Sequence, residues 1–245
     1  MVDDDPIDAL AREHEQLDAV LARLPLATWD APSAAPGWTV TDVLLHLAQS
    51  EEFVPVVAAH GEFVQRPPGV ELDQLMDMQV AGERGVTGPE VLERWRRACK
   101  ASVATLRECP RDARLPWATV PLSPWTLAST RIAEHWAHAL DITEPFGIDY
   151  PDTERLWHVA RLAHRTLPYA FTVAGETGGP VRCELVGPNG DSWIFGDADA
   201  ESVIRGSAAE FCRVGAQRLT AGKSLLSATG PYAAAALRVV RNYAV

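Results

Sequence analysis

The first 150 residues carry apolar positions at helical spacing, interrupted by proline- and glycine-rich turns. Asp5 followed by Pro6 is typical of a helix N-cap with proline at the first helical position. Apolar residues from Ile7 to Leu24 then recur every three or four positions. This pattern predicts a first helix that ends before Trp29.

Three more long helices begin at capping sequences. Their expected starts and extents are Thr39 with Asp42 (to about Ala59), Thr87 with Glu90 (residues 88–108) and Ser123 with Pro124 (to about 145–147). A shorter helix is expected over residues 71–83, after a break at residues 67–69 (Pro-Pro-Gly). Four long helices with irregular crossovers predict a four-helix bundle, whose core is a natural place for a metal or cofactor.

The pattern changes after residue 148, where we expect the bundle domain (1–148) to give way to a small α+β domain (149–245). Residues 181–186 alternate apolar and polar side chains, and a Pro-Asn-Gly turn separates them from residues 192–195, which predicts a β-hairpin. The expected helices of this domain run from about 149 to 171, from Asp199 to about Leu219, and from 232 to 243.

Composition narrows the function classes. The 245 residues are 47% hydrophobic and 22% charged, as in a soluble globular protein, and the net charge of −11 disfavours nucleic acid. An acidic N-terminus, no long apolar run and four cysteines without a CxxC pair predict a cytoplasmic protein with no membrane contact. We expect a small-molecule substrate and a monomer or homodimer.

Histidines and carboxylates on two of the predicted helices suggest a metal site. His46 shares an apolar face with Val43 and Leu47 and therefore points inward. Glu134 and His138 are four residues apart, so they project from one side of their helix, with Asp141 three residues further along that side. Three such ligands would leave a coordination position open, as in catalytic zinc sites, with Asp141 as an orienting acceptor or a base.

Periodicity leaves simpler interpretations open. A single histidine on an apolar face is more often a satisfied core residue than a ligand. Arg131, Glu134, His138 and Asp141 could form the solvent-facing stripe of their helix, and His135 with His138 is a competing pair. The segment is not HExxH, which disfavours a metalloprotease. We expect His14 to be exposed, because it lies between two glutamates.

Two short motifs favour the metal site. Residues 37–40 (Gly-Trp-Thr-Val), followed by Asp42 and His46, resemble the second-helix signature of the DinB-like bundle superfamily, in particular the mycothiol-dependent maleylpyruvate isomerase family. Glu134, His138 and Asp141 with the next Ile resemble its fourth-helix signature, and residues 206–218 are similar to its C-terminal, sterol-carrier-like pattern. The resemblance implies a mainly α protein, with a DinB-like four-helix bundle followed by a small α+β domain.

The resemblance also implies roles for individual residues. His46, Glu134 and His138 would ligate a divalent metal, with zinc expected and nickel, cobalt or iron left open. Asp141 and Arg218 would be catalytic, Arg218 by binding a substrate carboxylate.

The implied co-substrate is a small thiol, mycothiol, which would attack an electrophilic substrate in an isomerase or S-transferase reaction. A hydrolase or lyase that activates water at the same metal is one alternative. A non-catalytic small-molecule binder is the other.

The eight tryptophans suggest either a large core or an aromatic pocket. Trp38 belongs to the motif at the start of the second long helix. Trp136 lies about 160° from the midpoint of Glu134 and His138 around their helix, at about 100° per residue. Both are therefore predicted to be scaffold residues, which leaves Trp117 and Trp125 as pocket candidates.

Overall fold

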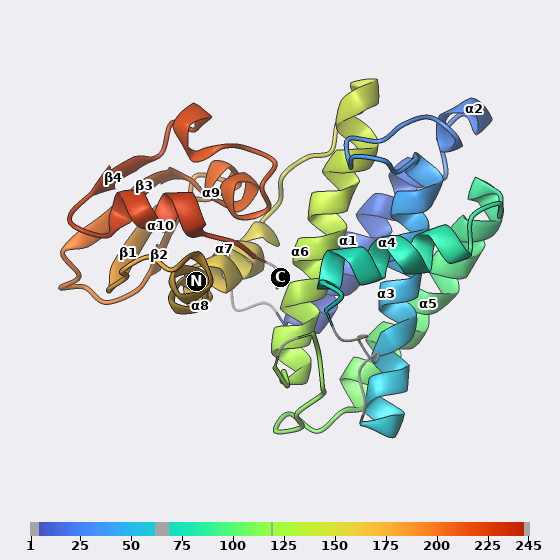
Figure 1. The fold of residues 1–245 in the computed structure, drawn as a ribbon, viewed down its shortest axis with the longest axis horizontal. Helices are drawn as coiled ribbons and strands as arrows, with labels where there is room; N and C mark the ends of the chain where they lie inside the picture. The colour runs from blue at the N-terminus through green and yellow to red at the C-terminus, as the bar shows by residue number, and fades with distance from the viewer. Residues whose placement is uncertain (1–4, 62–68, 119, 243–245) are drawn as a thin grey trace. The chain divides into compact units, whose positions relative to one another are not determined.

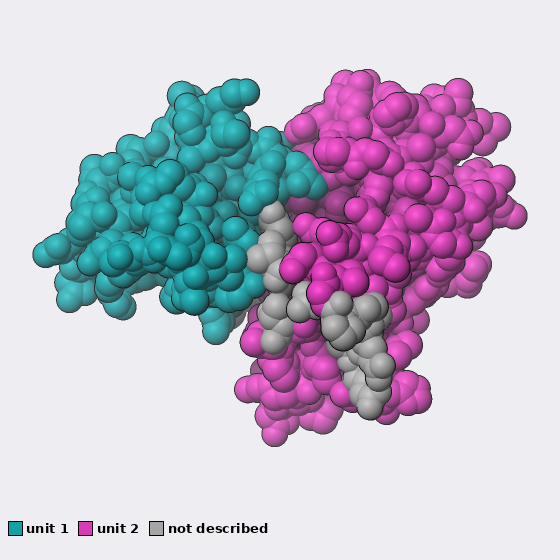
Figure 2. Space-filling model, viewed as in Figure 1, with its two compact units in different colours: residues 1–4, 151–244 teal, residues 5–150, 245 magenta. Residues whose placement is uncertain are grey.

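The structure is a computed structural model that describes residues 5–61, 69–118 and 120–242. The chain forms two compact units, residues 5–150 and residues 151–244 (Figure 2). The sequence places the domain boundary after residue 148, two positions before the end of the first unit. Among the described residues, no helix has both the length and the apolarity that a membrane span requires.

Four long helices build the first unit (Figure 1). They are α1 (Pro6–Leu21), α3 (Val40–His60), α5 (Gly88–Glu108) and α6 (Pro124–Thr143). Helix α1 packs against α5 and α6, and α3 packs against the same two helices, so the four helices surround one core. Shorter elements connect them, namely α2 (Leu26–Trp29), α4 (Leu72–Gly82) and the 3₁₀ helix η1 (Glu144–Phe146). The predicted four-helix bundle is confirmed.

Capping residues fix where these helices begin. The Thr39 side chain accepts a hydrogen bond from the Asp42 amide at 3.1 Å, and the Asp42 carboxylate accepts one from the Thr39 amide at 3.0 Å. Ser123 caps α6 by accepting from the Thr126 amide at 3.2 Å. The first helix ends at Leu21, before Trp29 as expected. Pro25 directly precedes α2, and the residue before a proline disfavours helical geometry, so the chain leaves the helix ahead of this proline.

Fully buried leucines and isoleucines fill the bundle core, including Leu10, Leu17, Leu44 and Leu127. Helix α3 also contains Pro55. Proline has no amide hydrogen, so the helical bond that residue 55 would donate to the Glu51 carbonyl is not made. The predicted break at residues 67–69 falls mostly outside the described residues.

The second unit contains a four-stranded sheet and short helices. Its strands are β1 (Val181–Val186), β2 (Ser192–Phe195), β3 (Ser202–Ser207) and β4 (Ser227–Thr229), in the spatial order β2-β1-β3-β4. Strand β1 pairs antiparallel with β2 and parallel with β3, and β3 pairs antiparallel with β4. The other elements are α7 (Leu156–Arg165), α8 (Leu167–Ala174), α9 (Ala208–Gly215), η2 (Ala221–Lys223) and α10 (Ala233–Val239). The predicted α+β composition and the β-hairpin are confirmed.

The three helices predicted for this unit were all too long, with α10 ending at Val239 instead of about residue 243, and one strand was not predicted. The expected helix from Asp199 is wrong, because residues 202–207 form β3 beside β1 and only residues 208–215 are helical. The β-branched pair Val203 and Ile204 favours a strand. The helix expected up to residue 171 is interrupted at Thr166, just before Pro168, and continues as α8. Strand β4 was not expected.

Candidate metal centre

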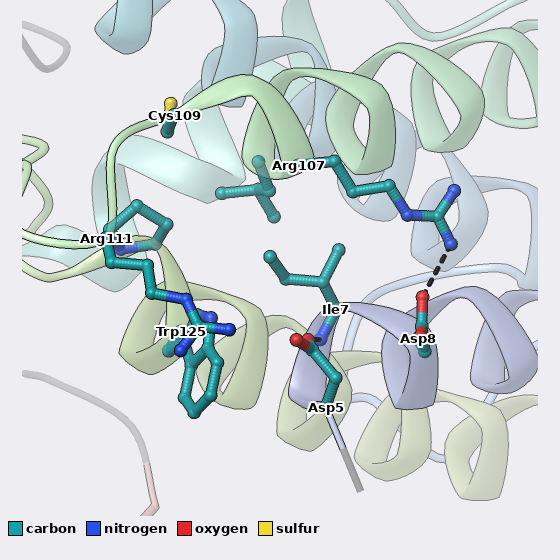
Figure 3. A pocket seen from close by; sticks show the side chains of 9 residues that line it. Asp5, Ile7, Asp8, Arg107, Cys109, Arg111 and Trp125 are labelled. Atoms are coloured by element: carbon teal, nitrogen blue, oxygen red, sulfur yellow. Dashed lines mark hydrogen bonds and ion pairs between the residues drawn. The ribbon is translucent and has the colours of Figure 1, made fainter.

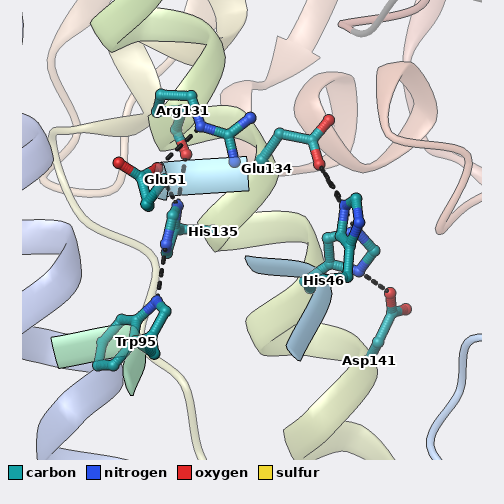
Figure 4. Close-up of polar contacts among 8 residues, drawn as sticks. His46, Glu51, Trp95, Arg131, Glu134, His135 and Asp141 are labelled. Atoms are coloured by element: carbon teal, nitrogen blue, oxygen red, sulfur yellow. Dashed lines mark hydrogen bonds and ion pairs between the residues drawn. The ribbon is translucent and has the colours of Figure 1, made fainter. Parts of the chain in front are cut away.

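Helices α3 and α6 bring two histidines and a glutamate together. His46 Nε2 and His138 Nε2 each lie 3.5 Å from Glu134 Oε2. One donor atom from each of the three residues lies within 4.8 Å of the other two (Figure 4). We refer to His46, Glu134 and His138 as the His–Glu–His cluster. It is the three-ligand group that the two sequence motifs suggested, and such a group could hold a divalent metal.

Asp141 orients one of the imidazoles. Its Oδ2 lies 2.9 Å from Nδ1 of His138, and both residues are on α6. Because an ionised carboxylate only accepts hydrogen bonds, Nδ1 donates, and Nε2 is turned toward Glu134. This carboxylate–imidazole arrangement is the usual support for a metal-binding histidine. Asp141 is 1% exposed, so it is held away from solvent.

The electrostatics of the cluster favour a charged carboxylate. Burial alone would raise the pKa of Glu134, but hydrogen bonds to His138 and His46 bring it well below its usual range. Burial lowers the pKa of His46, so its imidazole is neutral and able to ligate. Burial also opposes the charge on His138, yet hydrogen bonds to Asp141 and Glu134 raise its pKa above the usual value. The raised pKa means that His138 tends to hold a second proton, whose positive charge balances the carboxylates of Asp141 and Glu134. A metal cation that displaces this proton would balance the same two carboxylates.

Trp38 forms an aromatic wall beside the cluster, although the sequence suggested only a scaffold role. Its ring centroid lies 5.2 Å from that of His46, and it stacks on His138 at 6.2 Å with an interplanar angle of 22°. The indole N–H donates to Asp77 of α4 at 2.8 Å, which fixes the ring. No periodicity could reveal this contact, because Trp38 precedes its helix. Its place directly before the Thr39 cap was the available signal.

The solvent-stripe interpretation of α6 is wrong. Arg131 is 3% exposed and donates from Nε to the fully buried Glu51 at 2.8 Å. His135 is also fully buried, and its ring lies between Trp95 and Glu51 (Figure 4). The competing pair of His135 with His138 is therefore not the group that forms. Trp136 is buried at 2% exposure, in agreement with its predicted scaffold role.

The sequence of the bundle matches a known family. The profile of the mycothiol maleylpyruvate isomerase N-terminal domain matches residues 10–143, more than half of the chain. The chain belongs to the mycothiol maleylpyruvate isomerase family. The matched region contains His46, Glu134, His138 and Asp141, the residues that were carried over from the family's motifs.

Other members and solved structures extend the comparison to nearly the whole chain. Uncharacterized proteins from two strains of Mycobacterium tuberculosis are 32% identical over 255 residues, which cover 100% of this chain and 97% of theirs. Crystal structures of mycothiol-dependent maleylpyruvate isomerase and of its mutant match with TM-scores of 0.58 and 0.59. They are 18% and 17% identical and cover 91% of each chain, so they support the fold.

Two other residues of this family member were predicted at the site or a pocket, and each has contacts of its own. Arg218 follows α9 in the second unit, where its Nη1 donates to the Ala216 carbonyl at 2.8 Å. Trp117 lies beside Arg131, with the guanidinium carbon 5.7 Å from the ring centroid. The catalytic role of Arg218 stays a prediction.

A separate small pocket involves Trp125 (Figure 3). It has a volume of about 150 Å³, and the Arg111 guanidinium carbon stands 4.5 Å from the Trp125 ring centroid. The pocket is lined by Asp5, Ile7, Asp8, Leu106, Arg107, Cys109, Arg111, Pro124 and Trp125. It shares no residue with the His–Glu–His cluster. The expectation of Trp125 as a pocket residue is confirmed, but this pocket is not the metal site.

Proposed function

We propose that this chain is a metal-dependent enzyme that works with mycothiol on a small electrophilic substrate, as an isomerase or an S-transferase. The observation that carries the proposal is the convergence of His46, Glu134 and His138, whose donor atoms lie within 4.8 Å of one another. Membership of the mycothiol maleylpyruvate isomerase family supports the choice of thiol.

The residues present fit a zinc-like ion. Two imidazoles and one carboxylate are ligands that zinc accepts, and three protein ligands leave one position of a tetrahedron for a thiol or substrate. Glu134 is held ionised and His46 neutral, which are the states needed for ligation. The Glu134 side chain is 26% exposed, so the group is reachable from outside.

The chain's own residues supply positioning and shielding. When bound, a divalent metal would lower the pKa of a thiol at its open position and so favour the nucleophilic thiolate. Asp141 holds the His138 ring through Nδ1, so we assign it an orienting role rather than that of a base. Trp38 covers the two imidazoles on one side and limits the access of water there. Arg218 is proposed to bind a substrate carboxylate, because guanidinium pairs with carboxylates through two parallel hydrogen bonds.

The proposed reaction conserves the thiol in one branch and consumes it in the other. In the isomerase branch, the thiol adds across a conjugated cis double bond and the resulting single bond rotates. Elimination then releases the thiol and the trans isomer. In the transferase branch, the new carbon–sulfur bond is retained in the product. Both branches need an electrophilic substrate that is small enough to enter beside Trp38.

Metal content and thiol dependence test the proposal together. We expect the purified protein to contain zinc or a similar ion and to show turnover of an electrophilic alkene only when mycothiol is added. His46→Ala should lose both the cluster's metal and the activity. The exposed His60 of the same helix offers a matched control, and His60→Ala should keep both. Undiminished metal in His46→Ala would overturn the site, and turnover that is independent of thiol would favour the hydrolase alternative.

A further inference from the structure

A second group of polar side chains lies inside the bundle, and each of the four long helices contributes one member. His14 comes from α1, Glu51 from α3, Cys99 from α5 and His135 from α6. All four are buried, with exposures between 0% and 6%. This group shares no residue with the His–Glu–His cluster, and the proposed function does not use it.

Three of these side chains converge on one point. His14, Cys99 and His135 each offer a nitrogen or sulfur donor, and these three atoms all lie within 4.8 Å of one another. The two imidazole rings are 4.4 Å apart between centroids. We refer to His14, Cys99 and His135 as the His–Cys–His cluster. Glu51 lies beside it, with Oε1 at 3.9 Å from His14 Nε2 and 3.7 Å from His135 Nδ1.

The hydrogen bonds of His135 fix its tautomer. The Trp95 indole N–H lies 3.1 Å from His135 Nε2, and an indole can only donate (Figure 4). Nε2 therefore carries a lone pair, and Nδ1 carries the hydrogen, which it donates to the Arg131 carbonyl at 2.9 Å. Metal-binding histidines usually have this arrangement, in which the distant nitrogen donates to a carbonyl or carboxylate.

Two buried atoms of the group lack the partners that burial normally demands. In the described parts of the chain, neither His14 Nε2 nor Glu51 Oε2 has a hydrogen-bond partner, and both are shielded from solvent. Buried polar groups are nearly always satisfied, so such atoms call for an explanation. Burial lowers the pKa of His14 to about 4, so its imidazole is neutral and has a lone pair to share.

From this geometry we infer a second metal centre in the bundle core, with His14, Cys99 and His135 as ligands of a zinc-like ion. Thiolate and imidazole donors together favour zinc among the common divalent ions. On binding, the Cys99 thiol releases its proton to solvent and its sulfur bonds to the metal. His135 Nε2 exchanges the Trp95 hydrogen bond for the metal. Glu51 lies beside the two imidazoles, and its negative charge would help to balance that of the metal.

Burial and the nearby Glu51 carboxylate raise the pKa of the Cys99 thiol well above its usual value, so the thiolate needs a bound cation to stabilise it. Burial alone would raise the pKa of Glu51, but Arg131, His135 and His14 lower it to about 2, so it is ionised. Arg131 neutralises that charge through its 2.8 Å contact. The thiolate of Cys99 then offsets part of the charge of the metal. Because its three ligand residues are buried, a metal centre here would stabilise the fold rather than exchange ligands with solvent.

Cobalt substitution and X-ray absorption test this centre directly. Cobalt bound by a thiolate gives a sulfur-to-metal charge-transfer band, whereas the His–Glu–His cluster contains no sulfur. We expect the band in the wild-type protein and in His46→Ala, and its loss in Cys99→Ser. Cys109→Ser is a matched control, because Cys109 is a free thiol at the end of the same helix and lies outside the cluster.

A second measurement does not depend on variants of the core. Zinc-edge absorption of the zinc-loaded wild-type protein should show a sulfur scatterer at about 2.3 Å. Absence of sulfur from the zinc shell, or a cobalt band that survives in folded Cys99→Ser, would overturn the second centre. Failure of the mycothiol reaction would leave both sulfur signals unchanged, so the two proposals fail separately.

Discussion

Glu134 and His135 are neighbours in sequence on α6, yet they belong to clusters with different surroundings. The Glu134 side chain is 26% exposed and meets histidines from α3 and α6. The His135 side chain is fully buried and meets residues from all the other long helices. Helical geometry explains the divergence, because consecutive residues point about 100° apart.

The comparison separates two uses of the same residue types. An accessible cluster with three donors can exchange a ligand with solvent, which is what a reaction requires. The buried His–Cys–His cluster instead takes its side chains from α1, α5 and α6, with Glu51 of α3 beside them, so it couples the four helices. This difference predicts that substitutions around the buried His–Cys–His cluster (the closed cluster) lower the stability of the fold. Substitutions around the accessible His–Glu–His cluster (the open cluster) should instead weaken metal binding.

The largest effect is expected from the buried ion pair beside the closed cluster. Glu51→Ala leaves the charge of Arg131 buried and unpaired, and this should lower the free energy of unfolding by about 3–5 kcal/mol. Urea denaturation followed by circular dichroism measures the change. The next residue is the control, because Glu52 pairs with Arg94 at the surface and is 41% exposed. Glu52→Ala should lower the free energy of unfolding by less than about 1 kcal/mol. Equal losses of stability in the two variants would contradict the predicted difference between the buried and the surface ion pair.

An intermediate effect is expected at the open cluster. Asp141→Asn removes the charged acceptor of His138 Nδ1, and we expect metal affinity to fall about 10–100-fold. Competition with a chromophoric chelator measures this affinity. Asp18→Asn is the control, since Asp18 pairs with Arg96 on the outside of the bundle and should leave affinity unchanged. The sulfur signal of the closed cluster should be the same in both variants, and an unchanged affinity in Asp141→Asn would remove Asp141 from the site.

The smallest effect is expected from the cap of α3, the helix that carries His46 and Glu51. Thr39→Ala removes the bond from the Asp42 amide and should cost about 1 kcal/mol of unfolding free energy. Thr105→Ala is the comparison, because this half-buried threonine donates to the Ala101 carbonyl in the preceding turn of its own helix and caps no helix. We expect that change to stay within about 0.5 kcal/mol. Thermal unfolding measures the change in stability of both variants. A loss of stability in Thr39→Ala as small as that in Thr105→Ala would show that the cap is dispensable.

Much of the bundle could be predicted from sequence because its signals are local. Caps such as Thr39 with Asp42 act within one turn, and they lie where the sequence placed them. The small sheet was harder to predict, since β3 is stabilised by pairing with β1, about twenty residues earlier in the chain. Long-range pairing overrides the local preference that suggested a helix after Asp199.

The two clusters show the same limit at the level of single side chains. The His–Glu–His cluster was predicted because two motifs marked it. His14 was expected to be exposed, yet it is 6% exposed and lies against Trp95 and His135. His14 lies four residues after Leu10 and three before Leu17, and both leucines are fully buried. This helical spacing indicated an inward-facing His14, but the glutamates on either side of it suggested exposure instead.

The divergence of Glu134 and His135 also restricts how this helix can change during evolution. A residue inserted or deleted between Arg131 and Asp141 would rotate everything beyond it by about 100° and separate His138 from its partners. Single substitutions leave this phase intact. Length variation among descendants of this sequence should therefore collect in the connections between helices, while the ten-residue spacing from Arg131 to Asp141 stays constant.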